Sequence, residues 1–165
     1  MFDDLLDANR QFQSTFQDTG LAGVAAKGLA VLTCIDSRID PLAMLGLNPG
    51  DAKIIRNAGA RVTDDALRSL VLAVNLLGAK RVCVVHHTEC AMAGSTDDQV
   101  RARIEAASGA DASAWEFLAT TDQRATLESD IARIRACPLL PDDLIVGGFV
   151  FDVHSGELVP AVVDR

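Results

Sequence analysis

Apolar and polar positions follow two different rhythms along this chain, and each rhythm predicts a different kind of element. Over residues 3–18 the apolar side chains recur at helical spacing, with Leu5, Phe12 and Phe16 on one stripe, which predicts an amphipathic helix. Glycines interrupt the pattern afterwards, so residues 1–28 are interpreted as an N-terminal helical arm. A domain of this size has little surface of its own on which to bury such a stripe, so we hypothesise that a partner subunit covers it.

Short apolar runs alternate with helical ones after the arm. The runs predict strands at residues 29–33, 53–56, 81–85 and 144–151. A further edge strand is expected at 157–163, because its Pro160 cannot donate a hydrogen bond to a neighbouring strand.

A helix is predicted from the N-cap Thr63 to Leu77, where Gly78 is well suited to end it. Its apolar residues lie almost all the way round, so we expect it to be buried on most sides. Further helical segments are expected up to about Ala136.

Continuous β-branched strands separated by helices are typical of a parallel sheet covered on both faces. We therefore predict an α/β fold with a mostly parallel four-stranded central sheet, an added edge strand, helices on both faces and the N-terminal helical arm. No internal repeat or long linker divides the sequence. Residues 1–165 are thus expected to form a single domain, with the core at 29–165.

Composition narrows the function classes. The chain has 165 residues, 49% of them hydrophobic, and a formal net charge of −8, which is typical of a globular protein and not of a disordered acidic one. The acidic balance, without a cluster of Lys and Arg, argues against a nucleic-acid partner. The longest uncharged run, Ser69 to Ala79, is 11 residues, too short to span a membrane. Acidic residues at the N-terminus argue against a signal peptide, so we expect a cytoplasmic protein with reduced thiols.

Two polar clusters follow neighbouring strands of the predicted sheet. One begins at Cys34, after the strand at 29–33, and the other begins at His87, shortly after the strand at 81–85, and ends at Cys90. Open α/β folds place their sites at the carboxyl ends of parallel strands. Two thiolates and one imidazole form a three-ligand set suited to zinc, which leaves a fourth position for water or substrate. The same ligands would also tolerate Fe²⁺ or Co²⁺.

Asp36 and Arg38 stand two residues apart in the first cluster. Bidentate pairing with arginine would keep the carboxylate ionised and oriented. Such a carboxylate can accept the proton of a zinc-bound hydroxide and direct its lone pair at an electrophile. Alternatively, Asp36 could move onto the metal and close the fourth position, which would be an inactive form.

These motifs together resemble the β-class carbonic anhydrases, in particular the smaller prokaryotic members. The resemblance rests on C-x-D-x-R at 34–38, Arg-Asn-Ala-Gly-Ala at 56–60, H-x-x-C at 87–90 and the tail at 147–158, all in the family's order. It extends from about residue 29 to 163.

The resemblance implies a specific site and reaction. Cys34, His87 and Cys90 would bind one Zn²⁺ per chain, and Asp36 with Arg38 would form an Asp–Arg dyad. Members of the family hydrate carbon dioxide reversibly to bicarbonate and a proton. Zinc would lower the pKa of its bound water from 15.7 to roughly 7, and Asp36 would direct the resulting hydroxide at CO₂.

The resemblance also implies a homodimer, often assembled further into a tetramer, with the active site near the subunit interface. Gly59 is a candidate substrate-pocket residue, since a glycine there would let the backbone approach the substrate, although a turn explains it almost as well.

The sequence departs from the usual family pattern at three points. Ala91 stands where a glycine is usual after the second cysteine, and it would be strained if the backbone needed a positive φ. Glu89 replaces the common Asp inside H-x-x-C. The chain has no Tyr, so the bicarbonate-binding regulatory pocket of some members is not expected in its usual form.

The remaining thiols and imidazoles have simpler interpretations. Cys83 and Cys137 are expected to be core and helix-end residues, His86 to face away from His87, and His154 to be a turn residue. Two alternatives to CO₂ hydration remain open. One is a hydrolase of CS₂ or COS on the same scaffold, and the other is a non-catalytic zinc protein closed by Asp36.

Overall fold

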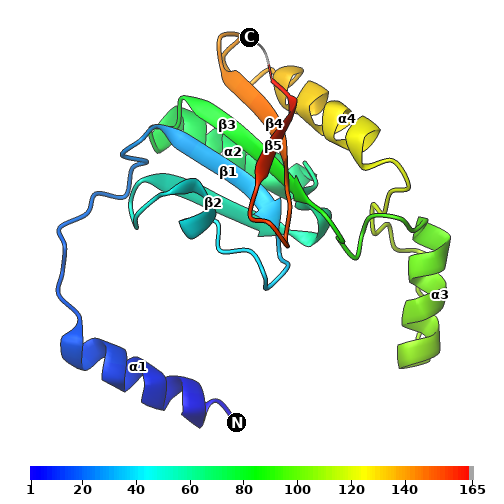
Figure 1. Ribbon diagram of the computed structural model, residues 1–165, viewed down its shortest axis with the longest axis horizontal. Coiled ribbons are helices and arrows are strands. Elements are labelled where there is room, and N and C mark those ends of the chain that lie inside the picture. Colours follow the sequence, from blue (N-terminus) through cyan, green and yellow to red (C-terminus); the bar gives the residue numbers. More distant parts are fainter. Residues whose placement is uncertain (164–165) are drawn as a thin grey trace.

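The computed structural model describes residues 1–163 and contains one five-stranded sheet (Figure 1). The strand order is β2-β1-β3-β4-β5, in which neighbouring strands of the first four run parallel and β5 pairs antiparallel with β4. The strands are β1 (Leu29–Cys34), β2 (Ala52–Asn57), β3 (Arg81–His87), β4 (Ile145–Phe151) and β5 (Leu158–Val162). The α/β fold with a mostly parallel sheet and an added edge strand is therefore confirmed.

Burial explains which strands occupy the centre. Five of the six residues of β1 and six of the seven of β3 are buried, as expected of parallel strands covered on both sides. β5, which contains Pro160, lies at the edge as predicted. In the register of the central pair, Thr33 of β1 lies opposite Val85 of β3. The two strands therefore end side by side.

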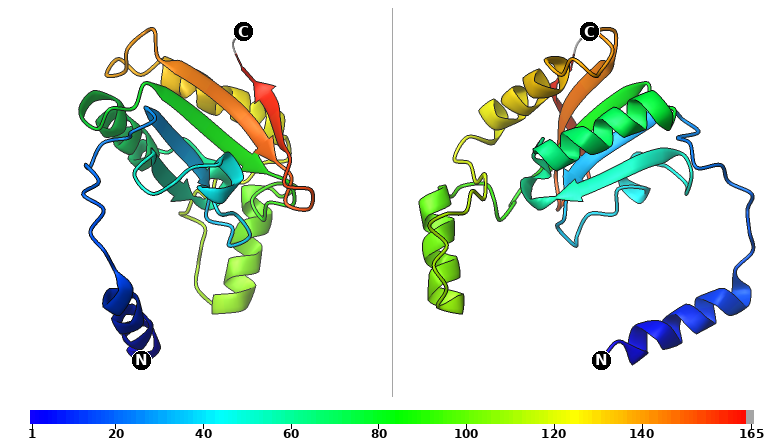
Figure 2. Two further views of the ribbon diagram at one scale, coloured as in Figure 1. Left: turned by 60° about the vertical axis from the view of Figure 1, so that its left-hand side comes forward. Right: turned by 180° about the vertical axis from the view of Figure 1, so that it is seen from behind.

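Two helices that lie in the connections between parallel strands pack on one face of the sheet (Figure 2). These are α2 (Asp64–Leu76) and α4 (Gln123–Arg135). Leu70 of α2 and Ile131 of α4 share one core cluster with Leu32 of β1. On the second face, where helices were also expected, the helical cover within residues 1–163 consists of the short 3-10 helices η1 (Ala43–Leu45) and η2 (Ala58–Ala60), together with loops.

Helix α2 begins as predicted and is less buried than predicted. The Thr63 side chain accepts a hydrogen bond from the Ala66 amide, which confirms it as the N-cap. Only Ala66, Leu70 and Ala73 are buried, whereas Leu76 is 69% exposed. The expectation of burial on most sides is wrong for this single chain, because α2 packs one stripe on the sheet, leaves its flanking apolar residues partly buried and exposes Leu72 and Leu76.

The N-terminal arm projects from the body of the molecule (Figures 1 and 2). Its helix α1 (Asp3–Thr15) contains no buried residue, and Phe12 and Phe16 are 60% and 59% exposed. Helix α3 (Asp97–Ser108) also lies apart from the sheet and buries none of its residues. The arm predicted from its apolar stripe is therefore present, with that stripe open to solvent in the isolated chain.

Among residues 1–163, no helix combines the length and the apolar character that crossing a membrane requires.

Candidate metal centre

The carboxyl ends of β1 and β3 bring together the three residues expected to bind a metal. Cys34 is the last residue of β1, His87 is the last residue of β3, and Cys90 follows in the next turn. One ligand atom of each residue lies within 4.8 Å of the other two, and all three side chains are buried. The predicted juxtaposition therefore arises because neighbouring parallel strands end at the same edge of the sheet.

His87 presents a free lone pair to this cluster. Its side chain is 1% exposed, and Nδ1 lies 2.9 Å from the carbonyl oxygen of Thr88, which can only accept a hydrogen bond. Nδ1 therefore carries a proton, and in the neutral ring Nε2 is the atom with the free lone pair. Nε2 is buried without any hydrogen-bond partner. A buried acceptor whose other ring nitrogen is held by a carbonyl is the usual state of a metal-binding histidine.

The two thiols form a tightly coupled pair. Their sulfur atoms are 3.9 Å apart, and the Gly59 amide donates to Cys34 Sγ at 3.3 Å. A hydrogen bond from the Cys90 thiol lowers the pKa of Cys34 well below its usual range, against the opposing effect of burial. The same contact and burial raise the pKa of Cys90. The cluster thus holds one thiolate and one thiol, and a cation between the two sulfurs would be needed to ionise both. The donor set therefore fits a divalent metal such as zinc.

Gly59 lies beside this pair on the short 3-10 helix η2 (Ala58–Ala60). Its φ is +76°, and a Cβ at this position would lie 3.2 Å from the Met92 side chain. Both observations explain why glycine occurs here. Gly59 was predicted as a residue of the substrate pocket. The structure adds a direct contact with Cys34 Sγ, through which its amide helps to hold the thiolate.

Asp36 and Arg38 form the bidentate pair that the sequence predicted. Arg38 Nε donates to Asp36 Oδ1 at 3.0 Å, and its NH2 group donates to Oδ2 at 2.8 Å. These bonds hold the pKa of Asp36 well below its usual range. Oδ2 also lies 3.9 Å from His87 Nε2. An ionised carboxylate of fixed orientation therefore borders the metal-ligand atoms.

Two residues that the sequence analysis did not select hold the backbone of this site. Arg56 donates from Nε to the Cys34 carbonyl at 2.8 Å and from its NH2 group to the Asp36 carbonyl at 2.7 Å. Gln123 of α4 donates to the His87 carbonyl at 3.0 Å. The first could have been found through its place in the Arg-Asn-Ala-Gly-Ala segment, whereas no sequence signal marks the second.

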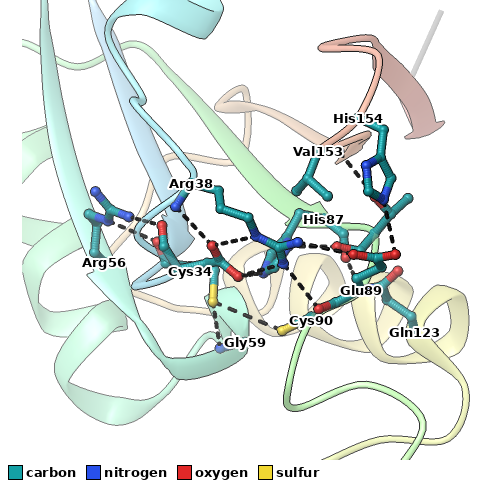
Figure 3. A network of polar contacts seen from close by, with 12 residues as sticks. Cys34, Arg38, Arg56, Gly59, His87, Glu89, Cys90, Gln123, Val153 and His154 are labelled. Carbon is teal, nitrogen blue, oxygen red and sulfur yellow. Dashed lines mark hydrogen bonds and ion pairs between the residues drawn. The ribbon is translucent and has the colours of Figure 1, made fainter.

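The strain anticipated for Ala91 falls instead on Glu89. Ala91 is not among the non-glycine residues with positive φ, whereas Glu89 has a φ of +55°. Glu89 Oε2 accepts from Arg38 at 3.0 Å, and Oε1 lies 2.9 Å from His154 Nε2. His154, expected to be only a turn residue, therefore also belongs to the polar network around the site (Figure 3).

The other candidates lie where the simpler interpretations put them. Cys83 is buried in the middle of β3, and the free thiol of Cys137 is half-buried just beyond α4. His86 is buried, and neither of its ring nitrogens has a hydrogen-bond partner. It lines a small cavity of about 10 Å³ behind Cys90.

Comparison with known proteins finds carbonic anhydrases and a related hydrolase. The sequence profile of a family described as carbonic anhydrase matches residues 29–158. Over 156 residues, which are 94% of both chains, the sequence is 36% identical to β-carbonic anhydrase 1 of Mycobacterium tuberculosis. It is also 32% identical, over 79% of this chain and 75% of the other, to a carbon disulfide hydrolase of Saccharolobus solfataricus. The structure resembles the crystal structure of the Streptococcus mutans carbonic anhydrase, with a TM-score of 0.90, 36% identity and coverage of 97% and 96%.

Proposed function

Because this chain belongs to the β-carbonic anhydrase family, we propose that it hydrates CO₂ reversibly to bicarbonate and a proton at a Zn²⁺ site made by Cys34, His87 and Cys90. The observation that carries the proposal is the convergence of three buried ligand atoms with the ionised carboxylate of Asp36 at their border. Zn²⁺ bound there would supply hydroxide near neutral pH by lowering the pKa of a coordinated water.

The Asp–Arg dyad has a definite task in this reaction. Asp36 is ionised, so it would accept a hydrogen bond from the nucleophile and orient it toward the carbon of CO₂. Arg38 holds both carboxylate oxygens and thereby prevents Asp36 from turning away. The carboxylate would lose this orientation if either residue were replaced.

The same contacts argue against a permanently closed, non-catalytic site. To reach a metal, Asp36 would have to give up hydrogen bonds from the Arg38 side chain and from the Arg38 backbone amide, which donates at 2.9 Å. Arg38 is itself held by Glu89. The open arrangement is therefore the one that the contacts of the dyad favour.

Stopped-flow CO₂ hydration between about pH 7 and 9, on protein of known zinc content, tests the proposal. We expect turnover that rises with pH, because hydroxide is the nucleophile. Asp36 stays ionised over this whole range, since its pKa is far below it, and so does not shape the profile. Full zinc occupancy with no CO₂ turnover at any of these pH values would contradict the proposal.

A carbon disulfide hydrolase activity is the second candidate, because three relatives of 30–33% identity carry that name. Both reactions would use the same hydroxide and the same dyad, and they differ in the substrate admitted. A competition assay among CO₂, COS and CS₂ separates them. A higher kcat/KM for CS₂ or COS than for CO₂ would replace the proposed substrate and leave the proposed metal site intact.

We also propose that the chain forms a homodimer in which the second copy covers the apolar stripe of the arm. The support is the full exposure of α1 in the isolated chain. The second face of the sheet also carries an apolar groove of about 400 Å³, bordered by residues such as Leu29, Leu45 and Phe149. Both surfaces are apolar and would be buried by association.

Deletion of residues 1–18 is expected to lower the mass of the particle in solution. The deletion removes Phe12 and Phe16, whose burial against another subunit would stabilise the assembly by about 1.5–3 kcal/mol for each aromatic side chain. Sedimentation velocity on the full chain and on the truncated chain measures the effect. An unchanged mass would show that the arm does not hold subunits together.

A further inference from the structure

The turn between β4 and β5 is hydrogen-bonded to Thr88, which lies between two of the metal-ligand candidates, His87 and Cys90. The Thr88 amide donates to the Phe151 carbonyl at 2.9 Å, and the Val153 amide donates to Thr88 Oγ1 at 3.1 Å. Beside this backbone connection, His154 Nε2 lies 2.9 Å from Glu89 Oε1 (Figure 3). A residue near the end of the chain thus reaches the polar network of the site.

Glu89 stands between His154 and the dyad. Its Oε2 accepts a hydrogen bond from Nη1 of Arg38 at 3.0 Å, and its backbone carbonyl accepts one from Nη2 at 3.2 Å. The residue adopts a φ of +55°, which a non-glycine residue keeps only when surrounding contacts enforce it. Glu89 therefore presents two acceptors to Nη1 and Nη2 of Arg38, next to the Nε–Nη2 edge that donates to Asp36.

The position of His154 is itself well defined. Asp152 Oδ1 accepts hydrogen bonds from the backbone amides of His154, at 2.9 Å, and Ser155, at 2.8 Å. The charged groups that face the imidazole are Glu89, Asp152 and Arg38. The hydrogen bond with Glu89 and its charge raise the pKa of His154 above its ordinary value.

We propose that His154 is a positioning residue for the reaction, which through Glu89 holds the guanidinium of Arg38 and thereby the carboxylate of Asp36. The inference rests on the proposed function. His154 is 70% exposed and Glu89 is 58% exposed, so the contact is an exposed pair of modest strength. The contact between His154 and Glu89 restricts the side chain of Arg38, which is 43% exposed. Without it, Arg38 and the Asp36 carboxylate that it holds would be free to move together.

His154 is not the end of a proton wire in this arrangement. Among residues 1–163, the hydrogen bonds that connect Glu89 to Asp36 pass through Arg38, and a guanidinium remains protonated and cannot pass a proton on. The role requires only a donor at Nε2, and both the imidazolium and one neutral tautomer provide it. A neutral donor of similar length should therefore replace histidine.

The test compares His154→Gln, which keeps a donor at this position, with His154→Phe, which keeps the ring and loses it. We expect kcat/KM for CO₂ to fall about three- to fivefold in His154→Phe and to stay within about twofold of wild type in His154→Gln. Glu157→Gln, at an exposed glutamate near the same turn, is the matched surface control and should leave kcat/KM unchanged.

The kinetic split separates positioning from proton transfer. Return of the proton to solvent follows bicarbonate release, so it enters kcat and not kcat/KM for CO₂. Two results would overturn the proposal. One is an unchanged kcat/KM in His154→Phe. The other is a loss of kcat alone in both variants that an imidazole buffer restores, because it would identify His154 as a proton acceptor.

A double-mutant cycle tests the route through Glu89. If His154 acts through this side chain, His154→Phe should have no further effect on kcat/KM in a Glu89→Ala background, which removes both carboxylate oxygens. Additive losses in the double variant would overturn the proposed route.

A readout that does not depend on turnover keeps this inference separate from the proposed function. In ¹H–¹⁵N spectra, the Arg38 Nε–H signal, assigned by its loss in Arg38→Lys, reports how firmly the guanidinium is held. We expect its hydrogen exchange with water to be faster in His154→Phe than in wild type and unchanged in His154→Gln. Equal exchange in all three proteins would overturn the positioning role even in an active enzyme. Absence of CO₂ turnover in the wild type would instead contradict the proposed function alone.

Discussion

Cys34→Ser is expected to lose bound Zn²⁺ and CO₂ hydration together. A serine hydroxyl at this position remains protonated and is a harder donor than a thiolate, so the site would be left with one thiol and one imidazole. The substitution also replaces the sulfur that contacts the Gly59 amide and the Cys90 thiol with a shorter, uncharged hydroxyl. We expect zinc affinity to fall by more than about 100-fold, the upper end of what loss of an outer-shell partner causes.

Zinc content per chain after dialysis, measured by mass spectrometry, and stopped-flow hydration on the same samples check this prediction. Cys137→Ser is the matched control, because Cys137 is a free, half-buried thiol just beyond α4 and outside the cluster of ligand candidates. The control should keep both zinc and activity. A Cys34→Ser protein that retained one zinc per chain would remove Cys34 from the ligand set.

Asp36→Asn is expected to keep zinc and to lose about 10²- to 10³-fold in kcat/KM. The amide has nearly the same shape as the carboxylate and lies outside the set of three ligand candidates, so the metal site should remain assembled. Two things are lost. Arg38 offers donors to both oxygens of Asp36, and an amide can accept from only one of them. The anionic acceptor that would orient the attacking hydroxide is also gone.

The same two measurements distinguish the roles of Asp36. Asp143→Asn, at an exposed carboxylate on the loop before β4, is the surface control and should behave as wild type. Undiminished turnover in Asp36→Asn would exclude the residue from catalysis. Loss of zinc together with turnover would mean that Asp36 contributes to metal binding, as in the closed form.

The elements of the core and the candidate ligand set were predictable because both depend on local patterns. Continuous apolar runs marked β1, β3 and β4, and Thr63 marked the start of α2. Once the strands were known to be parallel and adjacent, polar residues at their ends had to lie at one edge of the sheet. The position of Cys34 beside His87 follows from that rule alone.

Burial of α2 could not be judged from its apolar residues. An apolar side chain indicates that a surface can be buried and does not show what covers it. In the isolated chain only one stripe of α2 meets the sheet, and Leu76 is left exposed. The exposure of the arm was predicted correctly, because a single domain of this size has little surface on which the apolar stripe could be buried.

The sequence by itself determined where the apolar runs of the strands lie, which residue caps the start of α2, and which residue types are able to bind zinc. Only the tertiary structure decided that Glu89 joins Arg38 to His154, across 51 and 65 positions of the chain. These contacts depend on the packing of two turns against each other and on the left-handed backbone conformation of Glu89. No local sequence pattern indicates either feature. Spacing along the chain therefore identified the groups able to carry out the chemistry, while the packing of one turn against another decided what holds them in place.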